Sequence, residues 1–431
     1  MTLLADLLTT VFDRRDRFSW RSKPGDRPLT DLAADLIEAE GEVTGLTLAQ
    51  QLLAGYRVAD DDTKLAFFRH LAHEMTISPA AIRAALDAYE QGQSKATYRA
   101  YMEVSEAPRQ ELIRRLNRVP GATRTLVRMR TDLLRLGAGD DEMQALDLDF
   151  RHLFASWFNR GFLVLRPISW ESPAHILEKI IAYEAVHAIN SWDDLRDRLE
   201  PADRRCFAFF HPAMPDEPLI FVEVALTRGI PVAIHDVLTD KRPRIFPEDA
   251  DTAVFYSISN CQKGLAGISF GNSLIKQVAS DLSHELPGLK TFVTLSPIPG
   301  LVRWLTSQGA KPAKGDALRE QAARYLMQAK HPSGQPLDPV ARFHLGNGAR
   351  ILHLHADADR SDNGLAQSGG AMVNYLYDFD TITQNHERYA AKHEIAASSE
   401  IRGLAAAAEK AEKATEKAAK PAKKKDDKTT A

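Results

Sequence analysis

Apolar residues recur at helical intervals through residues 1–160. The members of two such stripes are Leu4, Leu7, Leu8, Val11 and Phe12, then Leu65, Phe68, Ala72 and Met75. Steps of three and four residues place side chains on one face of an α-helix. The pattern therefore predicts a series of amphipathic helices, each of which buries one face.

Capping and helix-breaking residues agree with this pattern. Ser78 followed by Pro79 is typical of the start of a helix, and Gly92 is typical of its end. Pro120-Gly121 separates two further helices. We expect a helical bundle over 1–160, and because no cluster of residues in it suggests chemistry, we expect it to serve oligomerisation or scaffolding, with substrate binding as the alternative.

Short runs rich in β-branched and aromatic residues replace the helical pattern from residue 161 onward. They cover 206–210, 219–226, 253–259, 291–295, 350–355 and 371–377. Six such runs predict a sheet. An amphipathic helix through Leu274, Val278 and Leu282 separates the third run from the fourth, so we expect those two strands to be parallel and joined by a right-handed crossover. We therefore expect the α+β class, with a second domain that contains this sheet over 161–395.

The last part of the chain has almost nothing to bury. Residues 396–431 are dominated by Ala, Lys and Glu. Such a composition predicts a disordered or loosely helical tail. The run Lys423, Lys424 and Lys425 fits a solvated tail better than a binding site.

Composition narrows the choice of partner and compartment. A net charge of −3, with 44% hydrophobic and 26% charged residues, offers no attraction for nucleic acid or an anionic membrane, so we expect small molecules or further copies of the chain as partners. Cys206 and Cys261 are too few for a disulfide framework and fit a reducing compartment. No apolar run approaches the ~20 residues of a membrane span. The first residues resemble no targeting signal, and no peroxisomal Ser-Lys-Leu ends the chain, so we expect a cytoplasmic protein.

A glycine-rich loop after the run 253–259 is a candidate phosphate site. Gly264, Gly267 and Gly271 allow positive φ and close approach of an anion to backbone N–H groups at a helix start. The spacing is neither that of a P-loop nor that of a dinucleotide fold. Gln262-Lys263-Gly264-Leu265-Ala266-Gly267 resembles the loop with which acyl-CoA N-acyltransferase (GNAT) folds hold the CoA pyrophosphate. A plain strand-to-helix turn would also explain the glycines.

Two side chains are candidates for chemistry. Ser296 stands before a proline at a strand end, where a serine alone is more often a turn or cap residue than a catalytic one. His344 precedes Gly346 and Gly348, which permit the tight backbone of a loop that presents a functional side chain. The alternative for His344 is a packed position beside Phe343.

Metal binding is not expected. His353 and His355 share one face of a strand but lack a third ligand nearby. The acids Asp357, Asp359 and Asp362 fail the spacing of a calcium loop, since glycine falls at position 8 of the segment instead of about position 6.

Ordered motifs over residues 150–380 resemble the malonyl-CoA decarboxylase family. They are FRHLFASWFNRGFLVLRPISWESPAHILEKIIAYEAVH, EPLIFVEVALT, YSISNCQKGLAGISFGNSLIKQV, TLSPIPG, FHLGNGA and GGAMVNYLYD. The resemblance implies a helical domain used in oligomer assembly, with a tetramer favoured, followed by a catalytic domain of the GNAT fold. It also implies conversion of malonyl-CoA to acetyl-CoA and CO2, in fatty acid metabolism.

The resemblance further implies the residues of the site. Ser296 and His344 would form the reactive pair, and Asn374 and Tyr375 would line the same pocket with a catalytic role. The residues expected to bind CoA are Ser259, Gln262, Lys263, Gly264, Leu265, Ala266, Gly267, Ile268, Ser269, Phe270, Gly271 and Asn272.

This chemistry suits the residues. Loss of CO2 leaves an enolate on the thioester, which serves as the electron sink, so no metal or organic cofactor is needed. We expect His344, with a reference pKa of ~6.5, to protonate the enolate, and Ser296 to orient the carboxylate. Two rivals are an N-acyltransferase, with Glu223 as its base, and a non-catalytic acyl-CoA sensor.

Overall fold

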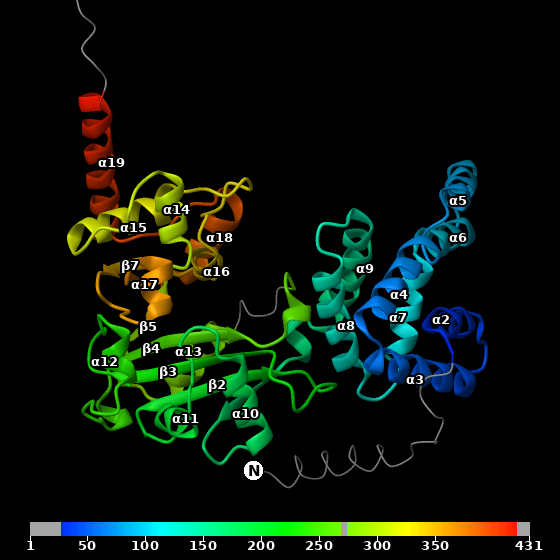
Figure 1. Ribbon diagram of the computed structural model, residues 1–431, viewed down its shortest axis with the longest axis horizontal. Coiled ribbons are helices and arrows are strands. Elements are labelled where there is room, and N and C mark those ends of the chain that lie inside the picture. Colours follow the sequence, from blue (N-terminus) through cyan, green and yellow to red (C-terminus); the bar gives the residue numbers. More distant parts are fainter. Residues whose placement is uncertain (1–26, 269–273, 420–431) are drawn as a thin grey trace, which may run out of the picture. The chain divides into compact units, whose positions relative to one another are not determined.

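The chain divides into two compact units, whose elements are labelled in Figure 1. A computed structural model describes residues 27–268 and 274–419. The helical unit comprises the residues up to Trp157 together with Lys263–Ile268, and the sheet unit comprises Phe158–Gln262 and the residues from Ser269 onward. The apolar stripe predicted near the start of the chain lies outside the described residues.

The helical unit confirms the predicted series of amphipathic helices. Its helices are α2 (Leu29–Glu38), α3 (Glu42–Val58), α4 (Asp61–His73), α5 (Pro79–Gln91), α6 (Lys95–Ser105), α7 (Pro108–Leu116), α8 (Ala122–Leu136) and α9 (Asp141–Trp157). The Ser78 side chain caps α5 by accepting a hydrogen bond from the N–H of Ala81, and Gly92 follows its last residue. Pro120-Gly121 separates α7 from α8, as the sequence predicts.

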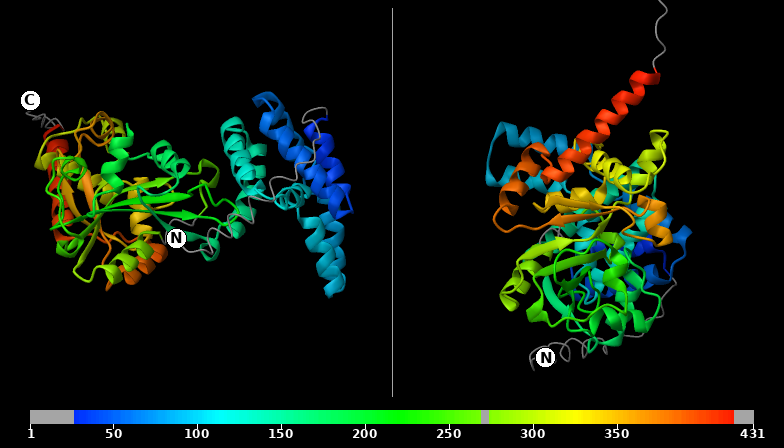
Figure 2. Two further views of the ribbon diagram at one scale, coloured as in Figure 1. Left: turned by 90° about the horizontal axis from the view of Figure 1, so that it is seen from below. Right: turned by 90° about the vertical axis from the view of Figure 1, so that its left-hand side faces the viewer.

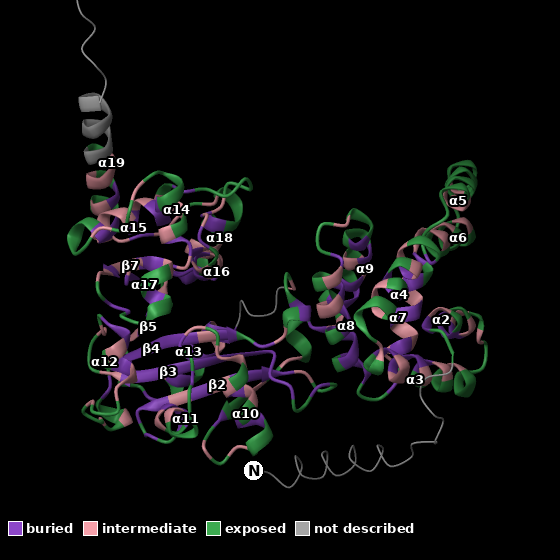
Figure 3. Cartoon of the chain, viewed as in Figure 1, coloured by how far each residue is buried: buried purple, intermediate pink, exposed green. Residues whose placement is uncertain are grey.

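Burial differs among these helices. Leu52, Phe68, Leu112 and Leu126 are fully buried and belong to the core that α3, α4, α7 and α8 share. None of the residues of α5 or α6 is buried, although both helices are amphipathic and contact each other. Figure 3 shows this pair as largely exposed.

The sheet unit contains all six predicted strands. Its described strands are β1 (Val164–Ile168), β2 (Arg204–Phe210), β3 (Ile220–Thr227), β4 (Thr252–Asn260), β5 (Thr291–Thr294), β6 (Ser296–Pro297), β7 (Arg350–His355) and β8 (Met372–Leu376). They form one sheet in the order β1-β2-β3-β4-β5-β8-β6, and β7 also pairs with β8. The strands β1 and β6 were not among the predicted runs.

One parallel pair lies in this otherwise antiparallel sheet. Strands β4 and β5 are parallel and are connected through α13 (Leu274–Glu285), as the sequence predicts. The remaining described helices are η2 (Arg160–Phe162), α10 (Ala174–Tyr183), α11 (Trp192–Leu199), α12 (Ile234–Leu238), η3 (Pro247–Asp249), η4 (Lys263–Leu265), α14 (Leu301–Ser307), α15 (Asp316–Gln328), α16 (Pro339–Gly346), α17 (Asp362–Ser368), α18 (Ile382–Lys392) and α19 (Ser399–Ala419). Figure 2 shows helices on both faces of the sheet. The α+β class, a helical region followed by a mixed sheet, is confirmed.

The segment that was expected to be a disordered or loosely helical tail from residue 396 contains the helix α19. Helix α19 contacts α15 and β7. Ile401 and Ala405, four residues apart on one face of α19, are buried, and Glu400 pairs with Arg319 of α15. A low-complexity composition hid this single apolar face, which is enough to dock the first turns of the helix.

Candidate active site

Ser296 and His344 reach one another from two separate elements. Ser296 lies in β6, directly after β5, and His344 lies on α16. Helix α16 begins after Asp338, whose side chain accepts a hydrogen bond from the N–H of Ala341 at 2.9 Å. The Oγ atom of Ser296 lies 3.2 Å from Nε2 of His344. The two residues singled out in the sequence, 48 positions apart, therefore meet within hydrogen-bond distance.

Two tyrosines of one strand face fix the imidazole ring of His344. The hydroxyl of Tyr377 lies 2.8 Å from Nδ1, and the ring of Tyr375 stacks on the imidazole with centroids 4.5 Å apart and planes 22° apart. The Tyr375 hydroxyl has no hydrogen-bond partner among the described residues. Tyr377 was not predicted, although the alternation of the run 371–377 places it on the same face as Tyr375.

Burial keeps the His344 imidazole neutral. The side chain is only 2% exposed, and desolvation lowers the pKa of His344 to about 3. The sequence alone led us to expect a pKa near the ordinary value for histidine, and the burial of His344 changes that expectation. At neutral pH one ring nitrogen of His344 carries a proton and the other accepts a hydrogen bond.

The hydrogen bonds around the pair are mutually consistent. The Ser296 hydroxyl donates to Oγ1 of Thr294 at 2.9 Å, so its oxygen is free to accept from Nε2–H of His344. In that tautomer Nδ1 accepts from the Tyr377 hydroxyl. Thr294 was missed in the sequence, and its place two residues before Ser296, at the end of β5, is the signal that could have found it.

Asn374 is brought close to the pair but does not contact it. The side chain is fully buried, and its amide donates to the carbonyl oxygen of Thr294 at 2.8 Å. Its Oδ1 lies 2.6 Å from Nε2 of His355. Both ends of the Asn374 amide are therefore engaged by the protein itself.

The glycine loop expected to bind CoA belongs to the helical unit over Lys263–Ile268. Arg130 of α8 donates from Nη1 to the carbonyl oxygens of Gly264 at 2.7 Å and Ala266 at 2.9 Å. A Cβ atom on Gly264 would lie 1.9 Å from the carbonyl oxygen of Val127, so only glycine fits there. These contacts fix the loop to the helix from one side.

The residues of the loop differ in their exposure to solvent. Gly267 adopts φ +76°, and Lys263, Ala266 and Gly267 are exposed, whereas Gly264 and Leu265 are buried. Ile268 is half-buried. The predicted binding residues Ser269, Phe270, Gly271 and Asn272 lie outside the described residues.

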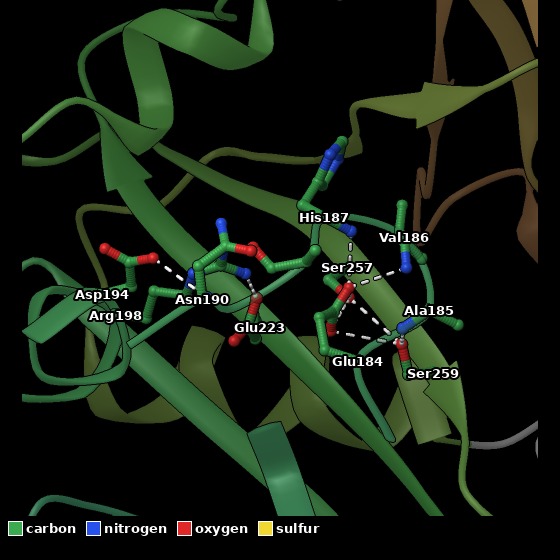
Figure 4. Close-up of polar contacts among 11 residues, drawn as sticks. Glu184, Ala185, Val186, His187, Asn190, Asp194, Arg198, Glu223, Ser257 and Ser259 are labelled. Carbon is green, nitrogen blue, oxygen red and sulfur yellow. Dashed lines mark hydrogen bonds and ion pairs between the residues drawn. The ribbon is translucent and has the colours of Figure 1, made fainter. Parts of the chain in front are cut away.

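Two further predicted binding residues, Ser259 and Gln262, are held by the sheet unit. The Gln262 side chain donates to the carbonyl oxygen of Pro218 at 3.0 Å. Ser259 is 1% exposed, and its hydroxyl donates to Glu184 at 3.2 Å while it accepts from the N–H of Ala185 (Figure 4). The Ser259 hydroxyl thus joins the loop after α10 to β4 instead of facing solvent.

Glu223, the base that an acyltransferase would require, is enclosed. It is 0% exposed and accepts from Nη1 of Arg198 at 3.0 Å (Figure 4). Desolvation raises the pKa of Glu223 to about 7, while Arg198 acts in the opposite direction. A carboxyl that is fully buried and paired with Arg198 is not exposed to an amine in solution.

No group of three or more His, Cys, Asp or Glu side chains suited to a metal ion occurs in the described part of the chain. His353 and His355 pair instead with Glu400 and Asn374. Cys206 and Cys261 are both free and buried. No helix within 27–268 or 274–419 combines the length and apolar character of a membrane span.

Family models match most of the chain. A model described as the malonyl-CoA decarboxylase N-terminal domain matches residues 76–158, and one described as the C-terminal domain matches 161–321 and 311–416. The chain is 34% identical over 344 residues to "Malonyl-CoA decarboxylase, mitochondrial" of Anser anser anser, a match that covers 67% of this chain and 68% of the relative. The protein of the same name from Rattus norvegicus is 33% identical over 348 residues, covering 68% of this chain and 70% of the relative.

Solved structures give the same result. The crystal structure of malonyl-CoA decarboxylase from Rhodopseudomonas palustris matches with a TM-score of 0.82 and 49% identity, covering 87% of this chain and 98% of that chain. The corresponding structure from Agrobacterium vitis matches with a TM-score of 0.82 and 47% identity, covering 88% of this chain and 99% of that chain.

Proposed function

The chain belongs to the malonyl-CoA decarboxylase family of carboxy-lyases, and from this premise we propose that Ser296 and His344 carry the reaction without a metal or organic cofactor. The observation that carries the proposal is the contact of 3.2 Å between Ser296 Oγ and His344 Nε2 in a buried setting. A hydroxyl and an imidazole are the groups that can orient a carboxylate and deliver a proton.

The stoichiometry of the decarboxylation requires a proton donor, a role that we assign to His344. The malonyl carboxylate leaves as CO2, its electron pair forms the thioester enolate, and one proton must then be added to the α-carbon. The neutral His344 takes up that proton from water when the substrate carboxylate approaches, because an opposite charge nearby favours the cationic form. The imidazolium then transfers the proton to the enolate carbon.

Ser296 provides a neutral hydrogen bond to the carboxylate or to His344. It holds the carboxylate out of the thioester plane, so that the breaking bond overlaps the carbonyl π system. A cation in this position would stabilise the departing carboxylate in the ground state and oppose its conversion to neutral CO2. Tyr375 supports the ring of His344 by stacking, and Asn374 supports the strand that carries Ser296.

The exposed part of the glycine loop is the proposed CoA diphosphate site, in a catalytic domain of GNAT type. Gly267, with φ +76°, exposes its backbone, and Lys263 is an exposed cation two residues from the buried Leu265. An exposed glycine backbone and an exposed lysine suit a diphosphate. The contacts of Arg130 with Gly264 would hold this loop ready for the ligand.

The helical unit is the proposed assembly domain, with a tetramer as the expected homo-oligomer. Tyr98 and Met102 of α6 are 52% and 50% exposed, and none of the residues of α5 or α6 is buried. Apolar surface of this kind is typically covered by another protein surface. Two free, buried cysteines fit the proposed cytoplasmic location, although the curated relatives named above are mitochondrial.

Product analysis tests the proposed activity. Purified chain that has been treated with a chelator should convert malonyl-CoA to equal amounts of acetyl-CoA and CO2, with no release of free CoA. Free CoA formed only in the presence of an amine would favour the acyltransferase instead. Absence of turnover by folded protein would contradict the proposed activity and favour a non-catalytic acyl-CoA sensor.

A further inference from the structure

The sheet has a gap beside Ser296 that side chains fill. Strand β8 pairs with β5 at Val293↔Leu376 and with β6 at Ser296↔Val373. Between these pairs, two hydrogen bonds that involve side chains join the strands. The Asn374 amide nitrogen donates to the carbonyl oxygen of Thr294 at 2.8 Å, and the N–H of Tyr375 donates to the Thr294 hydroxyl oxygen at 3.1 Å. The main chain just before Ser296 is therefore positioned by the side chains of Thr294 and Asn374.

A second hydrogen bond, from outside this gap, holds the other end of the Asn374 amide. Its Oδ1 lies 2.6 Å from Nε2 of His355. His355 belongs to β7, which pairs with β8. With Nε2–H of His355 as donor, the amide oxygen faces His355 and the amide nitrogen faces Thr294. Because the carbonyl oxygen of Thr294 can only accept, the amide nitrogen must face Thr294, and the amide oxygen is left to accept from His355.

His355 also faces a cleft. The cleft has a volume of about 650 Å³, and His353, His355, Arg319 and Glu400 are among its lining residues. The Nε2 atom of His355 contacts the buried Asn374, while the imidazole as a whole is half-buried. His355 thus connects this cleft with the strand segment that carries Ser296.

We propose that His355 is a positioning residue for Ser296, acting through the amide of Asn374 and the backbone and hydroxyl of Thr294. This inference rests on the proposed role of Ser296. Without the His355 donor, the buried Oδ1 of Asn374 loses its partner, and the amide is no longer held in the orientation that binds Thr294. A small displacement of the Ser296 hydroxyl then lowers the rate, because a misplacement of about 1 Å can cost on the order of 10²-fold.

His353 provides a matched control on the same strand. It lines the same cleft, but its Nδ1 contacts Glu400 at 2.6 Å and not Asn374. The change His353→Leu therefore removes an imidazole from the same cleft and the same strand, and leaves the hydrogen bonds around Asn374 in place.

The experiment compares His355→Leu, His355→Gln and His353→Leu in the full chain with malonyl-CoA as substrate. We expect His355→Leu to lower kcat by roughly 10-fold with KM changed by less than about 2-fold, since orientation and not binding is affected. His355→Gln should restore most of the kcat, because its side-chain amide nitrogen reaches about as far as Nε2. His353→Leu should keep the wild-type kcat.

Equal kcat values for His355→Leu and His353→Leu would overturn the proposal. If His355→Leu does not fold, His355→Asn replaces it, since its shorter amide cannot reach Asn374; equal activity of the Asn and Gln variants would then overturn the proposal. Ser296→Ala, measured in parallel, separates the two ideas. Activity retained by Ser296→Ala removes the proposed reactive pair, whereas an inactive Ser296→Ala beside a fully active His355→Leu removes only the positioning role.

Discussion

Gly264→Ala is the smallest change that tests the attachment of the glycine loop. The new Cβ would lie 1.9 Å from the carbonyl oxygen of Val127 and 2.8 Å from its carbonyl carbon. Val127 lies inside the continuous helix α8, so we expect the loop to move away. Overpacking costs about 1–3 kcal/mol, and loss of the charge-assisted hydrogen bond from Arg130 to Gly264 adds about 1.5–3 kcal/mol.

The expected loss of unfolding free energy in the helical unit is therefore about 2.5–6 kcal/mol. If the loop binds the CoA diphosphate, folded Gly264→Ala should also raise the KM for malonyl-CoA by roughly 10-fold or more, with a smaller effect on kcat. Denaturant titration and steady-state kinetics measure the two quantities. Gly92→Ala is the control, because nothing lies within 4 Å of its added Cβ. Unfolding free energy and KM that match those of Gly92→Ala would refute the reasoning.

Three further predictions concern charge and assembly. Burial lowers the pKa of His344 from 6.5 to about 3, so between these pH values the unfolded chain binds one proton more than the folded chain. The unfolding free energy of the wild type should therefore fall with decreasing pH by up to about 1.4 kcal/mol per pH unit. Denaturant titrations of His344→Gln should lack this contribution to the pH dependence, and equal pH dependence in the two proteins would contradict it. Glu223→Gln should keep kcat within roughly threefold, far from the ~10²–10⁴-fold loss of a general base, and a loss of that size would revive the acyltransferase. Light scattering at micromolar concentration should show several chains per particle, fewer after Tyr98→Ser with Met102→Ser, whereas a wild-type monomer would refute the assembly role.

Much of the fold could be predicted because local patterns and tertiary structure agree. The strand runs, the α5 cap at Ser78 and the parallel β4–β5 pair all follow from short-range signals. Strand β6 could not be found this way, since its two residues, Ser296 and Pro297, are too few for a pattern. The docking of helix α19 was not predicted, because it depends on contacts with α15 and β7, which composition does not reveal.

In the candidate site, too, some residues could be predicted from the sequence and others could not. Ser296 and His344 were identified by their motifs, and the structure brings them within hydrogen-bond distance. Their partners Thr294 and Tyr377 were missed, because a threonine and a tyrosine in strands are ordinary residues until the register is known. The lowered pKa of His344 could not be foreseen either, since it depends on burial by segments distant in sequence.

The turnover number of His344→Asn tests the central claim most directly. Asparagine keeps a hydrogen-bonding side chain but cannot deliver a proton at neutral pH. We expect kcat for malonyl-CoA decarboxylation to fall by about 10²–10⁴-fold, while the affinity for a non-reactive CoA analogue stays close to that of the wild type. Near-wild-type kcat in a folded His344→Asn protein would contradict the assignment of His344 as the proton donor.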